Sequence, residues 1–241
     1  MIRFILVSLF LITFLILSIP IHLIEWIIGK FNPQLKNKSS QNIVQWAFKV
    51  ILFISGVQLT IKGFDNVPKD KAVLYIGNHR SYFDIVITYS LAPGLTGYIA
   101  KKEMEHIPLL STWMKFLHCL FLDRDNIKEG LKTILTGIEY IKSGISICIF
   151  PEGTRNSGPK MLPFKEGSLK MADKTGCPII PFAMTNTRDI FENHFPKIKK
   201  THVILEYGTP IYPKELDREQ RKFLGAYTQN IIQEIYDENM K

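Results

Sequence analysis

The residues best suited to chemistry are a histidine and an aspartate that follow the apolar run Ala72–Ile76. The run predicts a buried strand, and Gly77 behind it lets the backbone turn. His79 can act as a general base near neutral pH. Asp84 lies too far along for the two to share a face of a plain helix, but a loop that enters a helix at about Phe83 would bring them together. The carboxylate would hold one ring nitrogen and leave the other for a substrate, although such a pair taken alone is more often a packing or surface feature.

Charged side chains also follow the other central strands that the sequence predicts. They are Lys101 and Lys102 after Gly97–Ala100, Arg124 after Leu120–Leu122, and the turn Glu152-Gly153-Thr154-Arg155 after Ile145–Phe150. In an open parallel sheet, ligands bind outside the carboxyl ends of the strands. The sequence therefore predicts a base, an acid and several cations at one edge of one sheet.

The turn that follows Phe150 is suited to binding phosphate. Gly153 allows a ligand to approach the backbone, Thr154 offers a hydroxyl, and Arg155 offers a planar fork that matches phosphate oxygens. The alternative is structural: Glu152 caps the turn and pairs with the arginine. The chain contains no nucleotide-binding G-x-x-x-x-G-K-[ST] loop and no cluster of histidine, cysteine and carboxylate, so we expect neither a metal nor a bound cofactor.

Apolar runs and periodic patterns alternate along the chain after Leu59. The predicted strands are Gln58–Lys62, Ala72–Ile76, Gly97–Ala100, Leu120–Leu122, Ile145–Phe150, Pro178–Met184 and Val203–Tyr207. The predicted helices are Phe83–Leu91, Leu109–Leu117, Ile127–Ser143, Gly167–Thr175 and Arg218–Asp237. This alternation favours an α/β fold with a largely parallel central sheet flanked by helices.

The helix predicted from Ile127 has the clearest signals. Asn126 can cap it, and an apolar stripe should face the core. The members of that stripe are Ile127, Leu131, Ile134, Ile138 and Ile141.

The N-terminal region differs in character from the rest. Residues Phe4–Ile24 contain no Asp, Glu, Lys or Arg, and about 20 apolar residues are enough to cross a bilayer. We expect a polar linker at Asn32–Gln41 and a second apolar helix at Asn42–Leu59, which would lie in the membrane interface, pair with the first helix, or pack on the globular part. The expected division is a membrane-associating helical motif at 1–57 and a catalytic domain at 58–241. Whether the helices span the bilayer or lie in one leaflet stays open.

Composition narrows the class of partner. The chain has 30 Lys and Arg residues against 22 Asp and Glu residues, a formal net charge of +8, which suits an anionic membrane or a phosphorylated substrate. No nucleic-acid-binding module is recognisable. Three cysteines without paired spacing, Cys119, Cys148 and Cys177, indicate a reducing compartment.

Four motifs in order resemble those of the glycerolipid acyltransferases, specifically the 1-acyl-sn-glycerol-3-phosphate (lysophosphatidic acid) acyltransferase type. They are Asn78-His79 through Asp84, Ala100–Met104 with Pro108 and Leu122–Arg124, Phe150–Arg155 with Phe164–Gly167, and Cys177–Pro181. The second block departs from the family pattern, because Ser111 and His118 stand where glycine is more usual and Met104 where leucine is.

The resemblance implies acyl transfer from acyl-CoA or acyl-carrier protein to the sn-2 hydroxyl of lysophosphatidic acid at the cytoplasmic face of a membrane. It implies that His79 is the base, that Asp84 orients it, and that the phosphate binds at a set of residues from the second and third blocks. That set is Lys101, Arg124, Glu152, Gly153, Thr154 and Arg155. The alternatives are a different acceptor such as glycerol 3-phosphate or another lysophospholipid, a cysteine-dependent thioesterase or hydrolase, and a non-catalytic lipid-binding protein.

Overall fold

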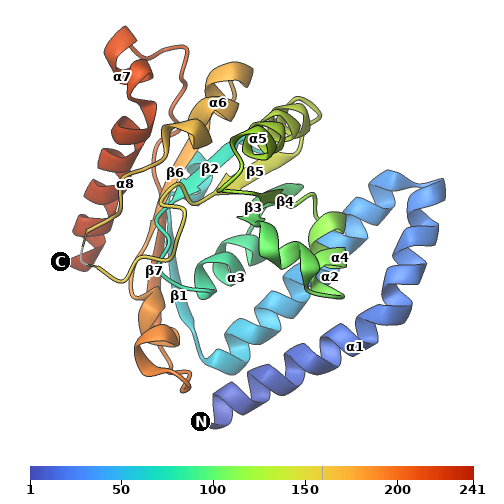
Figure 1. Ribbon diagram of the computed structural model, residues 1–241. Coiled ribbons are helices and arrows are strands. Elements are labelled where there is room, and N and C mark those ends of the chain that lie inside the picture. Colours follow the sequence, from blue (N-terminus) through green and yellow to red (C-terminus); the bar gives the residue numbers. More distant parts are fainter. Residues whose placement is uncertain (159) are drawn as a thin grey trace.

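The computed structural model, which describes residues 1–158 and 160–241, is built around one seven-stranded sheet (Figure 1). The strand order is β1-β7-β6-β2-β5-β3-β4. The strands are β1 (Gln58–Lys62), β2 (Leu74–Gly77), β3 (Thr96–Lys101), β4 (Leu120–Leu122), β5 (Ser146–Ile149), β6 (Ile179–Met184) and β7 (His202–Tyr207). Neighbours pair in parallel except β6 and β7, so β1 and β7 run opposite to the other strands. The predicted α/β fold with a largely parallel sheet is confirmed.

The sheet separates two apolar clusters, as the two-residue period of strands requires. In β2, Tyr75 contributes to one cluster while Leu74 and Ile76 contribute to the other. Helices cover both faces (Figure 1). They are α2 (Pro33–Ser55), α3 (Phe83–Ser90) and α4 (Leu110–Phe116) on one face, and α5 (Ile127–Lys142), α6 (Lys170–Thr175) and α8 (Leu224–Met240) on the other.

Helix α5 begins where the sequence predicted, because Asn126 Oδ1 accepts hydrogen bonds from the backbone N–H groups of Lys128 and Glu129. The predicted stripe is wrong in its first half. Ile127 is 89% exposed, whereas Ile138 is buried, because only the C-terminal half of α5 packs against the core. The predicted helix Arg218–Asp237 is in fact two helices, α7 (Arg218–Lys222) and α8, which meet at Phe223.

The predicted linker at Asn32–Gln41 is wrong, since helix α1 (Ile2–Phe31) is followed almost at once by α2. Asn32 forms the turn, and its side chain accepts a hydrogen bond from the N–H of Leu35 at 2.9 Å. Pro33 then opens α2, at a position where its missing N–H costs nothing. The polar residues of this stretch face a partner on α1: the Ser39 and Ser40 hydroxyls both donate to buried Glu25, at 2.8 and 3.1 Å.

Helix α2 ends at Ser55, earlier than the predicted Leu59, because Gly56 adopts a left-handed conformation with φ of 70°. The left-handed conformation of this glycine ends the helix and turns the chain toward β1, which begins two residues later.

Helix α1 is long and apolar enough to cross a membrane by length and composition, with a mean hydropathy of 2.8 over its most apolar 18 residues. It nevertheless packs on the globular part along much of its length. Phe4 stacks on Phe191 at 5.8 Å between ring centroids, Phe14 stacks on Trp113 at 5.8 Å, and His22 meets Trp113 edge-on at 4.8 Å. Its outward side carries exposed large apolar side chains, among them Ile5, Leu9, Ile12, Ile16, Ile19 and Leu23.

Candidate active site

The loop after β2 is fixed to the neighbouring strand before it reaches His79. Asn78 Nδ2 donates to the carbonyl of Met184 at 2.9 Å, and the N–H of Met184 donates back to Asn78 Oδ1 at 2.8 Å. Gly77 lies against the ring of Phe182, where a Cβ would sit only 2.1 Å from a ring carbon. The end of β2 therefore has room for glycine alone. The two hydrogen bonds between the Asn78 side chain and the Met184 backbone set the direction in which the loop leaves the sheet.

The side chains of His79 and Asp84 meet, with His79 Nδ1 lying 2.9 Å from Asp84 Oδ2. The same oxygen accepts the backbone N–H groups of Arg80 at 2.6 Å and Ser81 at 2.7 Å. Asp84 is fully buried in the first turn of α3, which begins at Phe83. The imidazole is thus held by its Nδ1, while within residues 1–158 and 160–241 its Nε2 makes no hydrogen bond to protein.

The His79 ring also lies against Phe150, the residue after β5, with centroids 4.4 Å apart and planes 19° from parallel. This stacking excludes water from one face of the ring and limits its rotation. The side chain stays 15% exposed, so a substrate can reach it. A histidine with one nitrogen bound by a carboxylate and the other free can accept a proton from a hydroxyl group.

The Glu152 side chain is buried beneath the loop that carries His79 and does not lie on the protein surface. It is 4% exposed, and both of its carboxylate oxygens are occupied by protein donors. Oε1 accepts the backbone N–H of His79 at 2.8 Å, and Oε2 accepts the N–H of Leu162 at 2.9 Å and Asn156 Nδ2 at 3.1 Å. The glutamate therefore joins the His79 loop to the turn after β5, and Gly153, with φ of 75°, lets that turn reverse.

Arg155 stands beside the His79 loop with its guanidinium carbon 3.5 Å above the centre of the Tyr82 ring. Its Nη2 donates to the Tyr82 hydroxyl at 2.9 Å, and its Nη1 lies 3.3 Å from Glu192 Oε1. Thr154, next to it, is exposed. Sequence reasoning missed Glu192 because no motif surrounds it and it lies 37 residues from Arg155.

The two remaining predicted cations are at the same edge of the sheet but farther away. Lys101 ends β3 and pairs with Glu103 at 2.7 Å, and Arg124 follows β4 and is exposed. Strand β5 lies between β2 and β3. The structure thus links His79 directly to Asp84 and to Glu152, and it places Arg155 on Tyr82 of the same loop. Within residues 1–158 and 160–241, Lys101 and Arg124 form no hydrogen bond or ion pair with His79, Asp84, Glu152 or Arg155.

Comparison with known proteins fits this geometry. The sequence profile of a family described as Acyltransferase matches residues 58–185, more than half of the chain. The chain belongs to the acyltransferase family. The resemblance drawn from the four motifs is thereby confirmed, and the matched region contains both partners of the His79–Asp84 contact.

Several relatives of this chain carry more specific names. Over 144 residues it is 34% identical to the 1-acyl-sn-glycerol-3-phosphate acyltransferase of Borreliella burgdorferi, a match that covers 59% of this chain and 57% of that protein. Over 203 residues the chain is 32% identical to the probable 1-acyl-sn-glycerol-3-phosphate acyltransferase of Mycoplasma pneumoniae, a match that covers 78% of this chain and 73% of that protein. The 1-acyl-sn-glycerol-3-phosphate acyltransferase of Saccharomyces cerevisiae (yeast) is 27% identical over 205 residues, a match that covers 82% of this chain and 66% of that protein. The chain thus spans less than two thirds of the Borreliella and yeast relatives.

The fold has a solved counterpart. The crystal structure of the 1-acyl-sn-glycerophosphate (LPA) acyltransferase, PlsC, from Thermotoga maritima matches with a TM-score of 0.82. The match covers 99% of this chain and 97% of that chain at 24% sequence identity. The likeness therefore includes the N-terminal helices as well as the sheet, and at this identity it is a likeness of fold.

Burial disfavours the thiolate form of the three cysteines in this chain. Burial raises the pKa of the Cys119 thiol to about 11, and burial also raises the pKa of Cys148 and of Cys177. Since the thiolate is the reactive form, these thiols stay protonated and inert at neutral pH. This weakens the alternative of a cysteine-dependent hydrolase. No group of metal-binding side chains occurs in the described parts of the chain.

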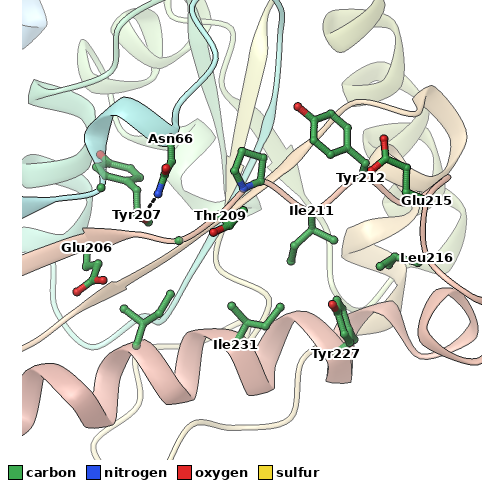
Figure 2. A pocket seen from close by; sticks show the side chains of 14 residues that line it. Asn66, Glu206, Tyr207, Thr209, Ile211, Tyr212, Glu215, Leu216, Tyr227 and Ile231 are labelled. Atoms are coloured by element: carbon green, nitrogen blue, oxygen red, sulfur yellow. Dashed lines mark hydrogen bonds between the residues drawn. The ribbon is translucent and has the colours of Figure 1, made fainter.

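A cavity lies elsewhere in the fold, between α8 and the segment that follows β7 (Figure 2). It has a volume of about 610 Å³, and Tyr212, Tyr227 and Ile231 are among the side chains around it. Because β7 runs opposite to β2, its carboxyl end lies at the edge of the sheet away from His79. None of the predicted site residues lines this cavity.

Proposed function

We propose that this acyltransferase moves a fatty acyl group from an acyl thioester to the sn-2 hydroxyl of lysophosphatidic acid, which gives phosphatidic acid. The observation that carries the proposal is the His79–Asp84 contact at 2.9 Å, together with a second ring nitrogen that makes no hydrogen bond to the part of the chain that the structure describes and a side chain that is 15% exposed. The names of the bacterial and yeast relatives support the choice of acceptor.

In the proposed reaction the substrate alcohol is itself the nucleophile. His79 Nε2 accepts the hydroxyl proton as the oxygen attacks the thioester carbonyl carbon, and the charge that develops on the ring is stabilised by Asp84. The tetrahedral intermediate collapses with cleavage of the carbon–sulfur bond, and the imidazolium returns its proton to the departing thiolate. The products are phosphatidic acid and a free thiol, so no acyl-enzyme, metal or cofactor takes part.

We assign the acceptor phosphate to Arg155, whose guanidinium is close to the His79 loop, with Gly153 and Thr154 at the same turn. Lys101 and Arg124 add positive charge at the carboxyl ends of the two outer strands. Glu152 receives a positioning role in this proposal, because its buried oxygens bind protein N–H groups and a carboxylate would repel a phosphate.

We also propose that α1 lies along one leaflet and does not cross the bilayer. Phe4 near its start and His22 toward its end both contact the globular part, so a perpendicular helix would draw Phe191 and Trp113 into the hydrocarbon. In the plane of the membrane, the exposed apolar side of α1 is buried in lipid while the domain stays in water. Residues 1–57 would then form the membrane-associating motif and 58–241 the acyltransferase domain.

The cytoplasmic face is the proposed location, because three free thiols fit a reducing compartment. The membrane pose can be tested with spin labels at Leu9→Cys and Leu23→Cys in a chain whose half-buried Cys119 is replaced by alanine, since Cys148 and Cys177 are buried. An in-plane helix gives similar immersion depths for both labels. One deep label and one at the opposite surface would show a spanning helix.

The activity test uses a labelled acyl thioester and a panel of acceptors: lysophosphatidic acid, glycerol 3-phosphate and lysophosphatidylcholine. The proposal expects phosphatidic acid from the first acceptor and a loss of about 10²–10⁴-fold in the His79→Ala variant. Acyl-CoA and acyl-carrier protein are supplied separately to identify the donor. Faster turnover of another acceptor, or a His79→Ala variant as active as the parent, would contradict the assignment.

A further inference from the structure

Glu192 makes three contacts with the loop and turn that form the candidate site. Its Oε2 accepts the Ser81 hydroxyl at 2.7 Å, and its Oε1 accepts the backbone N–H of Tyr82 at 2.8 Å. The same Oε1 lies 3.3 Å from Arg155 Nη1. The carboxylate is 12% exposed, so its attraction to the guanidinium is only partly screened by water.

The segment that carries Glu192 is itself firmly held. Ile190 is completely buried, and its carbonyl accepts the N–H of Lys199 at 2.9 Å. Phe191 stacks on Phe4 of α1 and meets Phe195 at 5.4 Å. Glu192 therefore projects from a fixed backbone, so its contacts can restrain the positions of the neighbouring side chains.

The guanidinium of Arg155 is restrained on two sides. Tyr82 lies under its plane and accepts from Nη2, and Glu192 holds Nη1. A guanidinium has five N–H donors, so these two contacts leave others available to a phosphate. A cation held in place before the ligand arrives binds more tightly, because less conformational freedom is lost on binding.

We propose that Glu192 is a positioning residue that aligns Arg155 for the phosphate of the acceptor lipid. The inference rests on the proposed function and extends it, since it makes recognition of the phosphate depend on a side chain outside the four motifs. Glu192 also contacts the loop that connects His79 to α3, so the test must separate alignment of Arg155 from support of that loop.

The variant that separates these roles is Glu192→Gln. Its amide oxygen can still accept the N–H of Tyr82, and its NH₂ can donate to the Ser81 hydroxyl, so the loop keeps its contacts. The charge opposite Arg155 is lost, and a charged hydrogen bond is about twice as strong as a neutral one. We expect the KM for lysophosphatidic acid to rise about tenfold with kcat nearly unchanged.

Two matched measurements complete the kinetic test. The KM for the acyl thioester and the rate with a phosphate-free monoacylglycerol acceptor should not change in Glu192→Gln. Asp189→Asn serves as the control, because this carboxylate is on the same segment but accepts its hydrogen bond from Asn193, at 2.8 Å. A fall in kcat with KM unchanged would mean that Glu192 only supports the loop, and would overturn the proposal.

Direct binding of dodecyl phosphate to the full-length chain in detergent gives a readout that needs no turnover. We expect Glu192→Gln to weaken this binding about tenfold, and Asp189→Asn to leave it unchanged. Equal affinity in the parent and in Glu192→Gln, or no binding by the parent, would refute the role of Glu192. If the parent binds dodecyl phosphate in a Glu192-dependent way but does not acylate lysophosphatidic acid, the acceptor assignment fails and the role of Glu192 stands.

Discussion

Replacement of Asp84 by asparagine removes one charge from the candidate site with little change in volume. Asp84 Oδ2 is 2.9 Å from His79 Nδ1 and also accepts two backbone N–H groups. An asparagine oxygen can keep those backbone bonds, so the loop should hold its shape. In the proposed reaction, what is lost is the attraction between the carboxylate and the imidazolium that forms as the acceptor is deprotonated.

The size of this loss follows from the geometry. Unit charges 2.9 Å apart attract by about 6 kcal/mol at an effective dielectric constant of 20 and by about 1.4 kcal/mol in water. The difference of about 4 kcal/mol, at 1.36 kcal/mol for each factor of ten, corresponds to about a 10³-fold fall in kcat.

The assay measures kcat for acyl transfer to lysophosphatidic acid in the parent, Asp84→Asn, His79→Ala and the double variant. If the two side chains act as a unit, the double variant is no slower than the slower single variant. Thermal unfolding of each variant shows whether the fold is kept. Asp173→Asn, which removes a carboxylate outside the candidate site, should leave kcat unchanged. Activity of Asp84→Asn within about threefold of the parent would refute the reasoning, since it allows less than 1 kcal/mol for the charge.

Three further predictions concern stability. Glu152→Gln should lower the free energy of unfolding by about 1–3 kcal/mol in a denaturant titration, because one of its bound N–H groups would then face an amide NH₂; an unchanged midpoint would contradict this. Gly77→Ala should cost about 1–3 kcal/mol, because the new Cβ would lie 2.1 Å from the Phe182 ring, and adding Phe182→Leu should restore part of the loss. Burial, with a smaller effect of Lys36, lowers the pKa of His118 below 6.5, so the unfolded chain binds this proton more readily and stability falls as the pH drops below that value. His118→Asn, which tolerates the local φ of 58°, should lose less stability than the parent between pH 7.5 and 5.5, and identical pH profiles would refute this assignment.

The family and the general fold were predictable from local patterns. The buried strand before His79 and the capped helix after Asn126 depend on residues that are adjacent in sequence, and both formed near the predicted positions. The polar stretch after Phe31 was misread, because Ser39 and Ser40 look like linker residues until Glu25 of the neighbouring helix is known to face them.

The sequence by itself determined which residue types stand at the carboxyl ends of the strands, because motif spacing and apolar runs are local properties. Only the tertiary structure decided what each of them contacts. Glu152 accepts a hydrogen bond from the His79 backbone. Glu192 binds both Arg155 and Tyr82, although it lies 110 residues from Tyr82 in the chain. The separation of Lys101 from that group likewise follows from the strand order, which places β5 between β2 and β3. Contacts of this kind depend on how the sheet and its loops come together, and no short stretch of sequence encodes them.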